Sequence, residues 1–179
     1  MKKNFRILTL CLCALMVAGT SALNAISVNQ TLSNLTIRDA NDNPTTIPDF
    51  GSKVLTIFYN DAEASDLSDP MADALKAKNF PASKNRGIGI ANLEESVAPN
   101  WLIRKIVRKK IAKYNSTILT DVDRTVAKSW GLGYTNNKSI CIIVGKDKKV
   151  KYIKYMDKKH PASQNDINYV VSLVEKLVK

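Results

Sequence analysis

The stretch FYNDAEASDLSDPMADAL, residues 58–75, decides the fold, because it joins the end of a buried strand to the start of a helix. The run KVLTIFY that leads into it, residues 53–59, is almost continuously apolar, as strands covered on both faces are. After a polar turn, Asp69 and Pro70 suit the N-cap and the first position of a helix. The helix could also begin near Ser65 and bend at Pro70.

Strands and helices alternate along the rest of the chain. Apolar runs predict further strands at residues 86–93, 116–121, 139–144 and 150–156, the last two joined by the turn GKDKK. The spacing of apolar residues predicts helices at residues 101–114, 123–131 and 163–178. A strand at residues 34–40 and the turn NDNP add a hairpin before them. We therefore expect an α/β sandwich, a central mixed β-sheet flanked by helices, with an N-terminal β-hairpin extension.

The N-terminus has the pattern of an export signal. Three cations precede the apolar run of residues 7–19, namely Lys2, Lys3 and Arg6. Small residues follow, so we expect a signal peptide at residues 1–25, cleaved after Ala22 or Ala25, and a periplasmic protein. A retained membrane anchor is the alternative. Residues 26–179 then form a single domain, and no later apolar run reaches transmembrane length.

Cysteine content and charge restrict the chemistry of the exported chain. Cys11 and Cys13 leave with the signal peptide, so Cys141 stands alone, and neither an internal disulfide nor a dithiol pair can form. Loss of three signal-peptide cations lowers the net charge from +11 to +8. Such a charge attracts anionic partners, although export argues against nucleic acid. The sequence indicates no cofactor and no metal site.

Several motifs resemble one known superfamily. The segment ILTDVDRTVAKSWGL, residues 118–132, is similar to the strand and short helix that thioredoxin-like proteins carry before their last hairpin. CIIVGKDKKVKYI, residues 141–153, is similar to that hairpin, with Lys148 in place of the usual glycine. Within the superfamily, MADALKAKNFP, IGIANLEES and NKSICIIVGKDKKV resemble the YtfJ-like periplasmic family. The resemblance covers residues 34–179 and implies a thioredoxin-like fold, but no established activity.

The resemblance also implies where a redox site would lie. The Cys-x-x-Cys of thioredoxin-like proteins falls on four residues that carry no thiol, Ala62, Glu63, Ala64 and Ser65. The cis-proline that faces such cysteines falls on Ser139, which should join its strand through ordinary trans peptide bonds. Because disulfide exchange requires a thiolate, these positions are expected to form a degenerate redox site on an intact scaffold.

Four other polar or reactive residues are candidates for a site. Cys141 lies in an apolar run and is expected to pack in the core. His160 has no cluster of partners around it and is expected at the surface. Asp121 and Asp123 lack the remaining ligands of a calcium loop, so capping of the next helix is the preferred interpretation.

The helix at residues 101–114 is unusually basic. Its apolar face is predicted to comprise Ile103, Ile106, Val107, Ile111 and Tyr114. The cationic side chains of the helix lie off this apolar face. They include the possible anion-binding residues Arg104, Lys105, Arg108, Lys109 and Lys113. They form either a solvated face or a docking surface for an anionic membrane or an acidic partner.

Three hypotheses on function follow. The leading one is an exported, non-catalytic binding module for an unknown periplasmic protein or anionic surface. The second is a thiol-dependent oxidoreductase or peroxidase-related enzyme that uses Cys141. The third is an anionic membrane-surface binder that uses the basic helix. The sequence leaves open whether the protein is an enzyme, and favours a role without catalysis.

Overall fold

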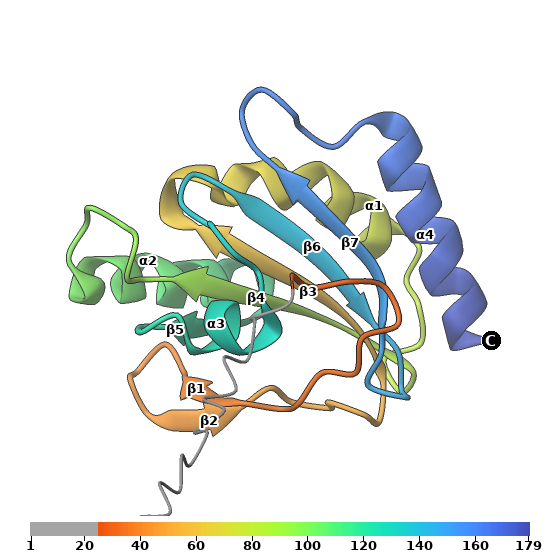
Figure 1. Cartoon of the computed structure of the whole chain (residues 1–179), viewed down its shortest axis with the longest axis horizontal. Helices are drawn as coiled ribbons and strands as arrows, with labels where there is room; N and C mark the ends of the chain where they lie inside the picture. The colour runs from red at the N-terminus through yellow and green to blue at the C-terminus, as the bar shows by residue number, and fades with distance from the viewer. Residues whose placement is uncertain (1–24) are drawn as a thin grey trace, which may run out of the picture.

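The computed structural model describes residues 25–179 as one mixed seven-stranded sheet with helices on both faces (Figure 1). The strand order is β2-β1-β5-β4-β3-β6-β7. The strands are β1 (Thr36–Arg38), β2 (Pro44–Thr46), β3 (Val54–Asp61), β4 (Asn85–Asn92), β5 (Thr117–Asp121), β6 (Ser139–Val144) and β7 (Val150–Met156). The helices are η1 (Ala62–Ser68), α1 (Asp69–Ala77), α2 (Asn100–Tyr114), α3 (Thr125–Trp130) and α4 (Gln164–Val178). The α/β class and the N-terminal hairpin are confirmed.

The predicted signal peptide lies outside the described residues, except for Ala25. None of the helices in residues 25–179 combines the length and the apolar character that crossing a bilayer requires.

The two most apolar strands, β3 and β6, are neighbours inside the sheet, and neither forms an edge. β3 lies between β4, to which it is parallel, and β6, to which it is antiparallel. Every side chain of β6 is buried, and so are all those of β3 except the half-buried Asn60. Both strands lie inside the sheet, as their continuous apolar runs predict.

Alternate residues of these strands contribute to two cores. On one face, α1 and α4 cover Phe58, Cys141 and Ile143 (Figure 1). On the other, α3 and the N-terminal segment cover a larger core that includes Ile57, Tyr59, Ile140, Ile142 and Trp130. α2 forms a smaller third cluster through Ile103 and Val107.

Helix starts differ in detail from the sequence prediction. Asp69 is the first residue of α1 rather than its cap, because the chain already turns as a 3-10 helix from Ala62. Arg124, in a left-handed conformation, is the N-cap of α3, while the Asp123 carboxylate accepts a hydrogen bond from the Thr125 amide at 3.1 Å. The capping box predicted for α4, from Ser163 and Asp166, is confirmed.

α2 packs on the sheet through a narrower apolar face than predicted. Ile103 and Val107 are buried and Ile111 is half-buried, but Ile106 and Tyr114 are exposed. The prediction that these last two residues face the core is therefore wrong. The rotation of the helix is fixed by contacts with a distant part of the chain.

Those contacts join α2 to the hairpin of β1 and β2. Arg104 forms an ion pair of 2.5 Å with Asp42 in the turn of the hairpin, and its side chain is only 12% exposed. One turn later, Arg108 donates a hydrogen bond of 2.7 Å to the Ala40 carbonyl. These two contacts, here called the arginine clamp, turn two cations of α2 toward the hairpin. β1 itself pairs with β5 only at Arg38 and Thr120.

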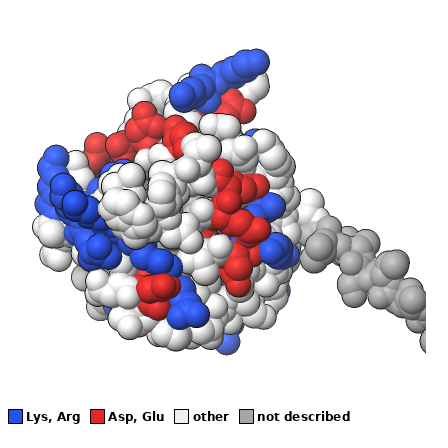
Figure 2. Space-filling model, turned by 90° about the vertical axis from the view of Figure 1, so that its left-hand side faces the viewer, with Lys and Arg blue, Asp and Glu red and all other residues white. Residues whose placement is uncertain are grey.

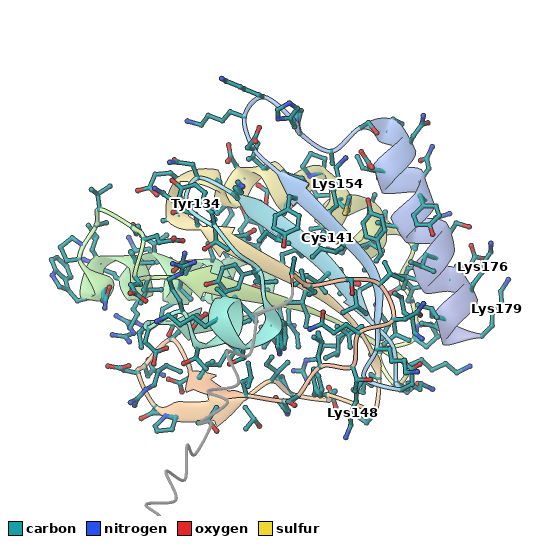
Figure 3. All side chains as sticks on the ribbon, viewed as in Figure 1. Tyr134, Cys141, Lys148, Lys154, Lys176 and Lys179 are labelled. Atoms are coloured by element: carbon teal, nitrogen blue, oxygen red, sulfur yellow. The ribbon has the colours of Figure 1, made fainter. Side chains whose placement is uncertain are left out.

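The turn between β6 and β7 carries a testable strain. Lys148 has φ +62°, in the left-handed region that favours glycine; Figure 3 labels this residue. Left-handed backbone costs a side-chain residue roughly 1–2 kcal/mol, partly offset by the larger entropy that glycine loses on folding. We expect Lys148→Gly to raise the free energy of unfolding by about 0.5–1 kcal/mol in urea titration. Lys146→Gly, in the same turn without a positive φ, should lower it; a stabilised Lys146→Gly would contradict this account.

Candidate functional site

The candidate site lies where parallel strands β3, β4 and β5 end, beside the start of β6. In open α/β sheets, this edge is where ligands bind. The four positions assigned to a degenerate redox pair, Ala62, Glu63, Ala64 and Ser65, lie in η1 directly after β3. Ser139 is the first residue of β6 and pairs with Asn60. The structure thus brings the five predicted positions to one end of the sheet.

Ser139 is linked to η1 by a chain of neutral polar groups. Its hydroxyl donates to the Asn60 side-chain carbonyl at 2.6 Å. The Asn60 amide donates to the Ser68 hydroxyl at 3.3 Å, which in turn donates to the Ser65 carbonyl at 3.1 Å. An amide carbonyl cannot accept a proton at neutral pH. The hydrogen bond to Asn60 therefore does not activate Ser139 as a nucleophile. All described peptide bonds are trans, as expected at Ser139.

Ser65 has a cationic neighbour that sequence analysis treated only as part of the basic helix. The Lys110 ammonium lies 3.3 Å from the Ser65 hydroxyl and donates to it. That hydroxyl also donates to the Ala62 carbonyl at 3.2 Å, within its own turn. Lys110 therefore anchors α2 to η1.

Two carboxyl groups meet at the start of η1, one from the buried Asp61 at the end of β3 and one from the exposed Glu63. Asp61 is fully buried and accepts hydrogen bonds from the Asn137 amide at 2.5 Å and from the Glu63 amide at 3.3 Å. A hydrogen bond with the Asp61 side chain, together with burial, raises the pKa of Glu63. Asp61, at the end of β3, and Asn137, in the loop before β6, are 76 positions apart, so no local pattern in the sequence predicts their contact.

A second polar network joins the ends of β4 and β5 to the loop before β6. The buried Asn92 amide donates to Glu95 at 2.6 Å, and the Thr135 hydroxyl donates to the same carboxylate oxygen. Arg124 pairs with the other Glu95 oxygen at 3.3 Å and donates to the Gly133 carbonyl at 2.7 Å. These contacts hold two loops together across the edge of the sheet.

Asp121 is the most deeply buried acid of this network. One of its oxygens, Oδ2, accepts hydrogen bonds from the Tyr59 hydroxyl and the Val126 amide, both at 3.0 Å. Its Oδ1 has no partner among the described residues. Burial raises the pKa of Asp121, and burial together with this neighbouring carboxylate raises the pKa of Tyr59. The capping role predicted for Asp121 is confirmed through Val126.

The remaining candidates lie outside this edge. Cys141 lies within β6, away from the candidate site. Figure 3 labels it together with Tyr134, which lies in the loop before β6. Burial raises the pKa of the Cys141 thiol, which is fully enclosed. His160 is exposed in the loop before α4 and contacts only Asp157, with Nδ1 3.1 Å from the carboxylate. Both placements agree with the sequence prediction.

Charge is unevenly distributed around the candidate site. Figure 2 shows this end of the molecule with cations gathered along one side and acids across its centre and top. Of the predicted anion-binding residues, Arg104 and Arg108 form the arginine clamp, whereas Lys105, Lys109 and Lys113 are exposed and form no ion pair within residues 25–179. Within residues 25–179, no three potential metal ligands among His, Cys, Asp and Glu come together.

Solved structures with the same architecture are thioredoxin-like. A peroxiredoxin-like protein from Aquifex aeolicus has a TM-score of 0.62 at 10% identity, covering 87% of this chain and 90% of that one. A putative thiol:disulfide interchange protein DsbE from Chlorobium tepidum has a TM-score of 0.62 at 10% identity, covering 87% and 100%. A hypothetical protein, SMc02350, from Sinorhizobium meliloti 1021 has a TM-score of 0.63 at 19% identity, covering 87% and 86%. These similarities show the fold.

No curated protein matches the sequence of this chain. A family model does, over residues 52–177, and that span includes η1, Ser139 and both polar networks. The chain therefore belongs to the family described as bacterial protein of unknown function (YtfJ_HI0045).

Proposed function

We propose that this chain is an exported, periplasmic, thioredoxin-like module that binds a partner and does not catalyse thiol exchange. One observation carries the proposal: none of the five positions assigned to redox chemistry carries a thiol, and the Ser139 hydroxyl donates to the neutral side-chain amide of Asn60 rather than to a general base. The apolar N-terminal run and its cations support export. A binding role fits a scaffold whose loops are held firmly while its side chains lack an activated nucleophile.

A thiol-dependent enzyme is the competing function, and it would have to use Cys141. Disulfide exchange and peroxide reduction both begin with a thiolate. Cys141 is enclosed by α1 and α4, and its raised pKa opposes the thiolate form at neutral pH. A substrate would have to open this core before it could reach the sulfur.

Thiol titration of the folded protein tests the proposal. We expect Cys141 to react with an aromatic disulfide reagent at least about 100-fold more slowly in native protein than in urea, because reaction awaits opening of the core. Native protein should neither reduce insulin nor consume peroxide. Cys141→Ala should keep the far-ultraviolet circular dichroism spectrum of the parent.

A matched variant controls for the reagent. In residues 26–179, which exclude Cys11 and Cys13, Ser172→Cys in a Cys141→Ala background leaves a single thiol, on the exposed face of α4, and it should react rapidly in the native state. Fast modification of native Cys141, together with insulin reduction or peroxide consumption that Cys141→Ala abolishes, would sink the proposal.

A further inference from the structure

The outer face of α2 and the loop before it expose more large apolar side chains than any other part of the described chain. Trp101 is 65% exposed, Ile106 48% and Tyr114 51%. Val97, in the preceding loop, is 94% exposed. Four of the seven large exposed hydrophobic residues in residues 25–179 thus lie between Val97 and Tyr114. Concentrated exposure of this kind marks an interaction surface.

Three lysines share this face. Lys105, Lys109 and Lys113 follow one another at four-residue spacing, so they form a row along the helix. All three are exposed, and none of them forms an ion pair with an acid of residues 25–179. The two arginines of the clamp, by contrast, are bonded to the hairpin of β1 and β2. Trp101 lies four residues before Lys105 and so continues this row, and Ile106 lies beside it; these five residues are here called the outer face.

We propose that the outer face of α2 docks on the surface of an anionic phospholipid bilayer. This proposal names a partner for the binding module proposed above. Lysine ammonium groups are attracted to lipid phosphates, and tryptophan lies well at the boundary between headgroups and acyl chains. Because Ile103 and Val107 stay in the protein core, the helix would rest on the surface without crossing it.

The shape of the outer face favours lipid over an acidic protein. A peptide partner would lie in a groove, yet α2 lines neither of the two best-formed pockets of the described residues, which lie beside β1 and between α1 and α4. The outer face is instead the convex side of a helix with separate protruding apolar side chains. A fluid headgroup layer adapts to such a surface, because it needs no matching shape.

Trp101 provides a direct readout. The chain has two tryptophans, and Trp130 is buried, so a change in fluorescence on binding reports on Trp101. The experiment uses residues 26–179, which contain all the described strands and helices. The apolar segment 7–19, which would itself enter lipid, is thereby left out. We expect vesicles of phosphatidylglycerol and phosphatidylcholine to shift the emission to the blue at low salt. Vesicles of phosphatidylcholine alone should not.

Two variants separate the charged and apolar contributions. Replacement of Lys105, Lys109 and Lys113 by Gln should weaken partitioning about 100-fold at low salt, since each lysine near an anionic surface is worth roughly a factor of five. Trp101→Ala should weaken it about tenfold and leave weaker, more salt-dependent binding. The matched controls are Lys146, Lys158 and Lys176 replaced by Gln, which remove equal charge from other faces, and Tyr169→Ala on α4. Both controls should bind like the parent.

Three outcomes would overturn the proposal. The first is no binding to anionic vesicles at low salt. The second is that replacing Lys146, Lys158 and Lys176 weakens vesicle binding as much as replacing Lys105, Lys109 and Lys113. The third is tight binding to polyglutamate with no emission shift on vesicles. The last would assign the outer face to an acidic protein. None of them bears on thiol reactivity, so failure here would leave the non-catalytic binding module standing with another partner.

Discussion

Replacing Asp121 with alanine is expected to lower the free energy of unfolding by about 3 kcal/mol. The substitution leaves the Tyr59 hydroxyl and the Val126 amide without their acceptor, and the Tyr59 side chain is fully buried. Each buried donor left without an acceptor lowers the free energy of unfolding by roughly 1–3 kcal/mol. Removal of a buried carboxylate offsets part of this loss, because the carboxylate itself is costly to bury. For a domain of this size, the midpoint of thermal unfolding should fall by about 9 °C.

Asp121→Asn is the matched control for this prediction. Its side-chain carbonyl can accept both hydrogen bonds, so it should be much milder than alanine at neutral pH. The folded pKa of Asp121 is raised, so its carboxyl group contributes stability at low pH that is lost as the pH rises through that folded value. The parent should therefore lose stability relative to Asp121→Asn as the pH rises above about 4. Calorimetry between pH 4 and pH 8 tests this pH dependence. An Asp121→Ala variant as stable as the parent would contradict the predicted loss of about 3 kcal/mol.

Replacing Trp130 with alanine should have a still larger effect, about 4 kcal/mol. Trp130 is almost fully buried, stacks on Phe50 with ring centroids 6.3 Å apart, and donates from its indole nitrogen to the Ser33 carbonyl at 3.1 Å. Its loss would leave a cavity between α3 and the N-terminal segment. Urea titration followed by circular dichroism measures the change.

The second tryptophan of the chain serves as the control. Trp101→Ala removes the same side chain from an exposed position, so it should change the free energy of unfolding by less than about 0.5 kcal/mol. A large loss in Trp101→Ala would show that this residue supports the fold, and its effect on vesicle binding would then need another explanation. A small loss in Trp130→Ala would mean that the segment before β1 contributes little to stability.

Continuous patterns in the sequence predicted the fold well. The unbroken apolar runs of β3 and β6 placed both strands inside the sheet, and local spacing located the capping box of α4. Such features depend on neighbours within a few residues. The thioredoxin-like order of elements and the family were predicted from the same local segments.

The polar networks could not be predicted in the same way. Tyr59 meets Asp121 across 62 positions, and Asp61 meets Asn137 across 76, so no local spacing marks either contact. The rotation of α2 was missed for the same reason. Its apolar residues span a wide arc, and contacts with distant parts of the chain, including Asp42 and Ala40 of the hairpin and Leu93 after β4, accompany burial of one part of that arc.

The arginine clamp also bears on self-association. β5 would be an open edge of the sheet if the hairpin of β1 and β2 left it, because β5 pairs with β4 on its other side. An unpaired strand edge is a template for addition of another chain. β1 pairs with that edge only at Arg38 and Thr120, so its own ladder holds it weakly. By tying the hairpin to α2, Arg104 and Arg108 keep the edge closed, and the protein is protected against intermolecular β-pairing by two cations on a neighbouring helix.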